Sequence, residues 1–277
     1  MLVPVIDAHH HFWRYSAAEY GWISDAMAVL RRDFLPGDLE QEIRAAGVDG
    51  VVSVQARQSV AETEWLLSLA EASPFIRGVV GWVPLAEPGV GAILDRLARR
   101  PKLKAVRHVV QDEPDGFLLR DDVNRGVSLL AARGIVYDIL IYERQLPETI
   151  AFVDRHPGQA FVLDHLAKPR IRDGALSPWR ERMRELARRP NVRCKLSGAV
   201  TEADWSGWTP AEIRPYLDAA LEAFGPARMM WGSDWPVCLV ATGYGRWRRT
   251  AEEALAGLTP SEREGILGLN AISAYRL

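Results

Sequence analysis

Near its N-terminus the chain reads Val5-Ile6-Asp7-Ala8-His9-His10-His11-Phe12-Trp13, a short apolar run that leads into three of its six histidines. Alternate side chains of an extended strand point to the same face. The run therefore predicts a strand with Asp7, His9 and His11 on one face and Ala8 and His10 on the other. Two imidazoles on one strand face can bind a metal ion or hold a polar group of a substrate. An isolated buried histidine is more often only hydrogen-bonded, so this run needs support from the rest of the chain.

Seven further runs rich in β-branched residues follow, separated by charged segments with helical patterns. The eight predicted strands are 5–12, 48–55, 76–83, 103–110, 135–142, 160–165, 192–197 and 229–234. The predicted helices are 38–46, 59–72, 90–100, 121–133, 146–155, 178–189, 210–224, 246–255 and 259–275. This alternation is typical of a (β/α)8 TIM barrel, and we predict one such α/β domain over residues 1–277.

The alternative α/β architecture is an open doubly wound sheet. No GxGxxG or GxxxxGK[ST] loop follows any predicted strand, which argues against that sheet and against a nucleotide cofactor. The longest connection, Trp13–Pro36, contains Arg14, Tyr15, Tyr20 and Trp22 and is a candidate lid over an active site.

Composition excludes several classes of protein. Hydrophobic residues make up 48% and charged residues 25% of the chain. The net charge is -2, so the chain lacks the excess of basic residues that proteins binding nucleic acid or membrane surfaces carry. No run reaches the ~18 apolar residues of a membrane span, and no secretory signal is recognisable. The two cysteines, Cys194 and Cys238, form no CxxC pair. We expect a cytoplasmic monomer or homo-oligomer that acts on a small molecule.

Polar side chains gather where the predicted strands end, which is the edge where TIM barrels carry their active sites. Burying an unpaired polar group costs about 1–3 kcal/mol, so this convergence favours a functional site over chance. The residues are His9, His11, Gln55, Arg57, Arg107, His108, Tyr142, Asp164, His165, Lys195, Ser197, Ser233, Asp234 and Trp235.

Three imidazoles and one carboxylate in this set, from His9, His11, His165 and Asp234, suit Zn²⁺ or a similar ion. Alternatively, Asp234 is a free general base that takes a proton from water. No GxSxG elbow is present and neither cysteine lies in a nucleophile motif. Hydrolysis by an activated water is therefore favoured over a covalent acyl-enzyme.

An ordered set of strand-end motifs resembles the amidohydrolase superfamily, and within it the sugar-lactonase, L-fuconolactonase-like branch. The motifs are Val5–Trp13, Val162-Leu163-Asp164-His165 followed by Lys168-Pro169, Cys194-Lys195-Leu196-Ser197-Gly198, and Trp231-Gly232-Ser233-Asp234-Trp235-Pro236. Further points of resemblance are Val54-Gln55-Ala56-Arg57, Arg107-His108, Tyr137-Asp138 and Glu143-Arg144-Gln145-Leu146-Pro147.

The resemblance implies a distorted (β/α)8 barrel, with the strand-one histidine pair at His9 and His11 and the strand-eight aspartate at Asp234. The superfamily's lysine or glutamate on strand four has no match, because that run offers Arg107 and His108. Its strand-five histidine is also missing, which argues against a two-metal site. The resemblance thus implies at most one divalent metal, Zn²⁺ first, held by His9, His11, His165 and Asp234, and some relatives work without a metal.

The implied activity is that of a carboxylic ester hydrolase, which opens L-fucono-1,5-lactone or a related galactono- or arabinono-lactone to the free aldonic acid. Asp234 would serve as base and then acid, and His9, His11 and His165 would polarise the lactone carbonyl. The substrate would be bound by Gln55, Arg107, His108, Lys195, Tyr142, Trp22 and Trp235. Two alternatives are a metal-dependent decarboxylase of the same superfamily and a non-catalytic sugar-binding barrel.

Overall fold

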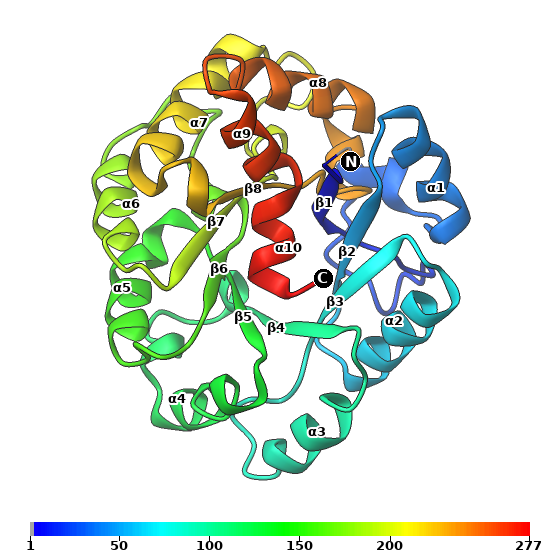
Figure 1. Cartoon of the computed structure of the whole chain (residues 1–277), viewed down its shortest axis with the longest axis vertical. Coiled ribbons are helices and arrows are strands. Elements are labelled where there is room, and N and C mark those ends of the chain that lie inside the picture. The colour runs from blue at the N-terminus through cyan, green and yellow to red at the C-terminus, as the bar shows by residue number, and fades with distance from the viewer. Residues whose placement is uncertain (1–2) are drawn as a thin grey trace.

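The computed structural model describes residues 3–277 and contains eight parallel strands in chain order, each hydrogen-bonded to the next (Figure 1). Every predicted strand is present, and the predicted (β/α)8 barrel is confirmed. The strands are β1 (Ile6–His10), β2 (Gly50–Val54), β3 (Ile76–Gly81), β4 (Leu103–Val109), β5 (Val136–Leu140), β6 (Phe161–Leu163), β7 (Val192–Leu196) and β8 (Met229–Trp231).

Helices surround the strands and bury apolar side chains against their outer face (Figure 1). They are α1 (Pro36–Ala45), α2 (Val60–Ala72), α3 (Val90–Leu97), α4 (Asp121–Val127), α5 (Leu146–Asp154), α6 (Trp179–Ala187), α7 (Pro210–Phe224), α8 (Tyr244–Ala254), α9 (Pro260–Glu264) and α10 (Asn270–Tyr275). The predicted helix 210–224 is confirmed at both ends, and Thr209 and Glu212 form a capping box at its start. The predicted helix 259–275 is instead α9 and α10 joined by a π-helical turn, Gly265–Leu269.

The barrel closes between β8 and β1 by a few contacts at its C-terminal end. His11 N–H donates to the carbonyl of Trp235 (2.6 Å), and Asp234 N–H donates to the carbonyl of His9 (2.8 Å). At the opposite end α10 crosses the middle of the ring of strands (Figure 1), where Ala271, Ala274 and Tyr275 share a buried apolar cluster with the strands. The C-terminal helix therefore fills the N-terminal mouth of the barrel.

The barrel interior has an apolar layer next to α10 and a charged layer above it. Because inward-facing residues on a strand are two apart, Ala105, Val136 and Val162 in the apolar layer are each followed, two positions later, by a charged residue. Together with a lysine from β7 these residues form the charged layer, which consists of Arg107, Asp138, Asp164 and Lys195. All four lie beneath the strand ends where the site was predicted.

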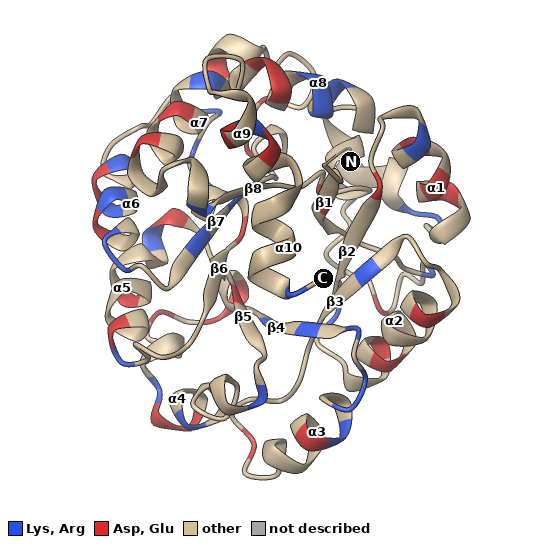
Figure 2. Cartoon of the chain, in the orientation of Figure 1, with Lys and Arg blue, Asp and Glu red and all other residues tan. Residues whose placement is uncertain are grey.

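The outer surface carries both signs of charge, interspersed over the surrounding helices (Figure 2). This mixture agrees with the net charge of -2 and with the absence of a basic footprint in the sequence. Within residues 3–277, none of the helices has both the length and the apolar character that a bilayer crossing requires.

Candidate active site

A cavity of about 650 Å³ opens at the C-terminal ends of the strands. Its floor includes His11, Arg107, His165 and Asp234, which follow or end β1, β4, β6 and β8. Aromatic side chains of Trp13, Trp22, Tyr142 and Trp205 line its walls. A volume of this size suits a small-molecule ligand, and the walls combine apolar faces with a few polar groups, as ligand sites commonly do.

The carboxylate of Asp234 lies among three imidazoles. Its Oδ1 is 3.4 Å from Nε2 of His11, 3.8 Å from Nε2 of His9 and 3.9 Å from Nε2 of His165. Asp234 has a left-handed backbone with φ of 58°. This conformation is uncommon outside glycine and often marks a functional position.

The hydrogen bonds of His11 decide which of its nitrogens faces the cavity as an acceptor. Nδ1 lies 2.9 Å from the carbonyl oxygen of Val54, which can only accept, so Nδ1 carries the proton. In neutral His11 the lone pair of Nε2 is therefore directed toward Asp234 and toward Nε2 of His9, 3.1 Å away. His11 is thus oriented as a ligand or an acceptor.

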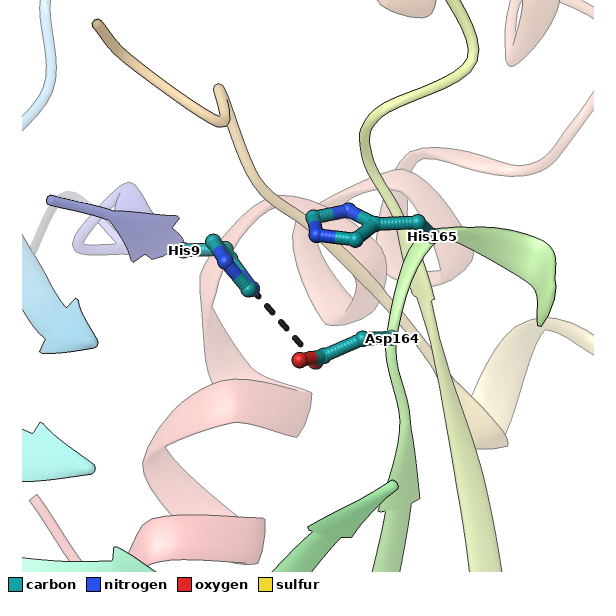
Figure 3. A group of neighbouring side chains, drawn as sticks. All are labelled: His9, Asp164 and His165. Atoms are coloured by element: carbon teal, nitrogen blue, oxygen red, sulfur yellow. Dashed lines mark ion pairs between the residues drawn. The ribbon is translucent and has the colours of Figure 1, made fainter. Parts of the chain in front are cut away.

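The charged layer supports His9 from below. Lys195 Nζ lies 2.6 Å from Asp138 Oδ2, 2.9 Å from Asp164 Oδ1 and 3.2 Å from His9 Nδ1. Arg107 donates to Asp164 Oδ2 at 2.9 Å and to Gln55 Oε1 at 2.9 Å. His9, Asp164 and His165 point toward one another from β1 and from the end of β6 (Figure 3).

The surroundings shift the pKa values of these groups in different directions. Burial lowers the pKa of His165 to about 4, although the charge of Asp234 opposes this. Burial alone would raise the pKa of Asp234, but the neighbouring imidazoles of His165 and His11 lower it below its ordinary value. Burial likewise opposes ionisation of Asp164, but the ammonium of Lys195 lowers its pKa well below the usual range. At neutral pH the site therefore contains ionised carboxylates beside a neutral His165.

A left-handed turn follows β6 and shapes one side of the cavity. The four residues from His165 to Lys168 have φ values of 52°, 56°, 58° and 47°, a conformation that costs roughly 1–2 kcal/mol per residue. The indole of Trp179 donates to the carbonyl of Leu166 at 2.7 Å and holds the turn. A Cβ at Gly198 would lie 2.5 Å from Nδ1 of His165, so only glycine admits this ring position.

The donor atoms of this site fit one divalent metal ion. In tetrahedral zinc sites, bonds of about 2.0–2.1 Å place the donors roughly 3.3 Å apart. His9 Nε2, His11 Nε2 and Asp234 Oδ1 lie 3.1–3.8 Å from one another. Asp164 Oδ1 pairs with Lys195 at 2.9 Å and also lies 3.4 Å from His9 Nδ1. It is placed to accept from His9 Nδ1–H, which would turn the Nε2 lone pair toward an ion.

We expect the protein to bind one Zn²⁺ per chain and His11→Gln to lose this binding. Elemental analysis after dialysis gives the stoichiometry, and the melting temperature of the wild type should rise with zinc because the ion binds only the folded site. His108→Gln is the matched control, since that ring lies outside the cavity and bonds to Glu113. Equal zinc content in wild type and His11→Gln would contradict the assignment of these donors.

The eleven residues predicted to bind or transform the substrate separate into three groups. Six line the cavity: His11, Trp22, Arg107, Tyr142, His165 and Asp234. Three lie directly beneath it and are fully buried: His9, Gln55 and Lys195. His9 and Gln55 contact lining residues and Lys195 contacts His9, but all three are too deep to form a wall of the cavity.

Two predicted substrate-binding residues lie elsewhere and require correction. His108 follows the inward-facing Arg107 on β4, so alternation turns it outward, where it stacks on Phe117 with ring centroids 4.6 Å apart. Trp235 is buried in an aromatic cluster, edge-on to Phe34 at 5.2 Å, and forms no part of the cavity wall.

The predicted face of β1 is wrong at Asp7. The register between β1 and β2 shifts between Asp7 and His10, so strict alternation does not hold. Asp7 accepts from Ser233 N–H (2.8 Å) and from the hydroxyl of Tyr244 on α8 (3.0 Å) instead of facing the cavity.

The Trp13–Pro36 segment is a wall of the cavity, anchored by paired backbone hydrogen bonds between Trp13 and Phe34.

The strand-end reasoning missed several residues near the site. Asp138 is a lone acid inside the apolar run of β5, a signal that could have been followed. Lys168 and Glu202 line the cavity but follow turns after β6 and β7, and local periodicity does not extend into turns. Only the left-handed turn brings Lys168 back to the cavity.

Comparison with known proteins gives consistent matches over nearly the whole chain. A protein-family model described as Amidohydrolase matches residues 6–277. The chain is 46% identical to an L-fucono-1,5-lactonase of Burkholderia multivorans (98% of this chain, 96% of that protein) and 38% identical to one of Burkholderia ambifaria (98% and 95%). A solved amidohydrolase of Burkholderia multivorans with bound zinc superposes with a TM-score of 0.95 at 45% identity, over 99% of each chain.

Proposed function

The chain belongs to the amidohydrolase family, and we propose that it is a lactonase that hydrolyses the ring ester of a sugar acid, L-fucono-1,5-lactone or a related aldonolactone. The observation that carries this proposal is an ionised carboxylate, Asp234, on the floor of a cavity beside the imidazole of His11 and the neutral imidazole of His165. Such an arrangement can activate water without a covalent intermediate.

In the proposed reaction a water molecule stands between Asp234 and the lactone carbonyl carbon. Asp234 accepts a proton from this water while the oxygen of the water bonds to the carbonyl carbon. The bond from that carbon to the ring oxygen then breaks, and Asp234 returns the proton to the leaving oxygen. The product is the open aldonic acid, and the carboxyl group of Asp234 is again ionised.

The developing negative charge on the carbonyl oxygen needs donors on the cavity floor. Arg107 and His165 line that floor, and Arg107 is held in place by Asp164 and Gln55. We assign these two side chains to polarise the carbonyl, with His9 and Lys195 orienting them from below. A divalent metal held by His9, His11 and Asp234 would add Lewis-acid polarisation when bound.

The experiment that tests this function is a screen of sugar lactones with a pH indicator. Fucono-, galactono-, arabinono- and rhamnono-lactones are compared side by side, because only a lactonase releases acid from them. A metal-dependent decarboxylase would instead release carbon dioxide from aromatic acids. A sugar-binding barrel would show melting shifts without turnover. Absence of acid release from every lactone would overturn the proposal.

We expect an acid limb of kcat/KM near pH 4, well below the ordinary histidine pKa of 6.5. The pKa of His165 is lowered to about 4 by burial and that of Asp234 is also lowered, so both remain in their working forms until the pH falls through these values. Rates between pH 5 and 7.5 should change by less than about twofold. Initial rates in a series of buffers measure this, and a limb centred near pH 6.5 would show that His165 titrates as an ordinary histidine.

A further inference from the structure

One charged pair on the cavity wall has no role in the proposed proton transfer. Lys168 Nζ and Glu202 Oε1 lie 4.0 Å apart, and both side chains are largely buried. Both residues line the cavity next to Tyr142, whose ring centroid lies 5.3 Å from the ammonium. A direct hydrogen bond needs about 2.7–3.2 Å, so the ammonium keeps its donors and the carboxylate its acceptors for a ligand.

The backbone holds Lys168 at the cavity by an uncommon route. In a turn with three residues per revolution, side chains three apart lie on the same side. The left-handed turn from His165 to Lys168 thus brings both side chains to one cavity, and Lys168 N–H closes it on the carbonyl of His165 at 2.8 Å. Strained conformations of this kind persist where the surrounding structure requires the resulting side-chain position.

We propose that Lys168 and Glu202 form a subsite that binds two neighbouring ring hydroxyls of the lactone, with Tyr142 against the ring face. This inference rests on the proposed lactonase function. A hydroxyl is both donor and acceptor, so it accepts from an ammonium and donates to a carboxylate. An ammonium and a carboxylate side by side therefore match a vicinal diol.

The partner of Lys168 argues against a role on the lactone carbonyl. The carbonyl oxygen gains negative charge in the transition state, and the carboxylate of Glu202, which lines the cavity beside the ammonium, would repel it. Asp164, the partner of Arg107, is instead fully buried and does not line the cavity. Hydroxyls of the sugar remain neutral throughout the reaction. The pair therefore suits recognition of the substrate, which should appear in KM more than in kcat.

The test compares L-fucono-1,5-lactone with δ-valerolactone, which has the same six-membered ring ester and no hydroxyls. For Lys168→Met and Glu202→Gln we expect kcat/KM on the sugar lactone to fall about tenfold to a hundredfold, mainly through KM. On δ-valerolactone both variants should stay within about threefold of wild type. Lys168→Arg, which keeps charge and donors, should recover part of the loss.

Arg170→Met is the matched control. This cation lies two residues after Lys168, pairs with Glu143 at 3.0 Å and is exposed to solvent. Arg170→Met should leave kcat/KM on both lactones unchanged. Circular dichroism and melting temperature confirm that each variant is folded.

Binding is measured in parallel by quenching of tryptophan fluorescence, since Trp22 and Trp205 line the cavity. The probe is L-fuconate, and Lys168→Met should weaken its binding by a factor similar to that in kcat/KM. An equal loss on both lactones would assign Lys168 to the carbonyl and overturn the subsite, as would unchanged KM and unchanged binding. A wild type that turns over no lactone would reject the lactonase function alone, and the fluorescence titration would still decide the subsite.

Discussion

Asp234→Asn should lower kcat on L-fucono-1,5-lactone by about a hundredfold to ten-thousandfold, the usual contribution of a positioned general base. The amide keeps the size of the side chain but cannot accept a proton from water. KM should change little, because the carboxylate acts on the water and not on the sugar hydroxyls. Steady-state rates of purified wild type and variant, with background hydrolysis subtracted, measure the effect.

Asp95→Asn provides the control for this substitution. Asp95 lies on α3, is exposed and pairs with Arg133, so the same chemical change there should leave kcat within about twofold of wild type. If Asp234→Asn turned over the lactone at nearly the wild-type rate, Asp234 would have no part in the proton transfer. The cavity would then require another base.

Lys195→Met should lower the free energy of unfolding by about 3–5 kcal/mol, the range for removal of one partner from a buried ion pair. Lys195 is fully buried between the carboxylates of Asp138 and Asp164, at 2.6 Å and 2.9 Å. Without the ammonium, Asp138 loses the positive charge that pairs with it, whereas Asp164 loses one of two and keeps its ion pair with Arg107. Urea unfolding at pH 7.5 measures the change.

The loss should be smaller at pH 5. Burial raises the pKa of Asp138 to about 6 even beside Lys195, so this carboxyl is readily protonated once the ammonium is gone. The double variant Lys195→Met with Asp138→Asn should recover part of the stability for the same reason. Lys104→Met, whose exposed ammonium donates to the carbonyl of Arg276, should stay within about 0.5 kcal/mol of wild type. A loss of similar size in Lys104→Met and Lys195→Met would contradict a special role for the charged layer.

Periodicity in the sequence was sufficient to predict the barrel, because strands and helices repeat on short scales that each segment carries within itself. The charged layer follows from the same rule. On β4, β5 and β6, an apolar inward position is followed two residues later by Arg107, Asp138 or Asp164. The rule also separates Arg107, which faces inward, from His108, which faces outward, although the two were predicted together.

Depth along the barrel is not contained in any local pattern. Lys195 and Gln55 were expected to touch substrate, yet both lie one layer below the cavity. Their positions depend on how far each strand is shifted against its neighbours, which all eight strands decide together. The C-terminal helix shows the same limit, because Tyr275 donates to Asp138 at 2.8 Å across 137 positions of the chain.

The sequence by itself determined the alternation of strands and helices, the position of the helices outside the strands, and the polar residues that meet at one edge of the barrel. Only the tertiary structure decided which of those residues reach the cavity. Lys168 reaches it because Trp179 and Gly198 stabilise four left-handed residues that local preferences oppose. Local sequence patterns reflect the conformational preferences of single residues and their near neighbours. A strained turn exists only when contacts from distant parts of the fold hold it in place.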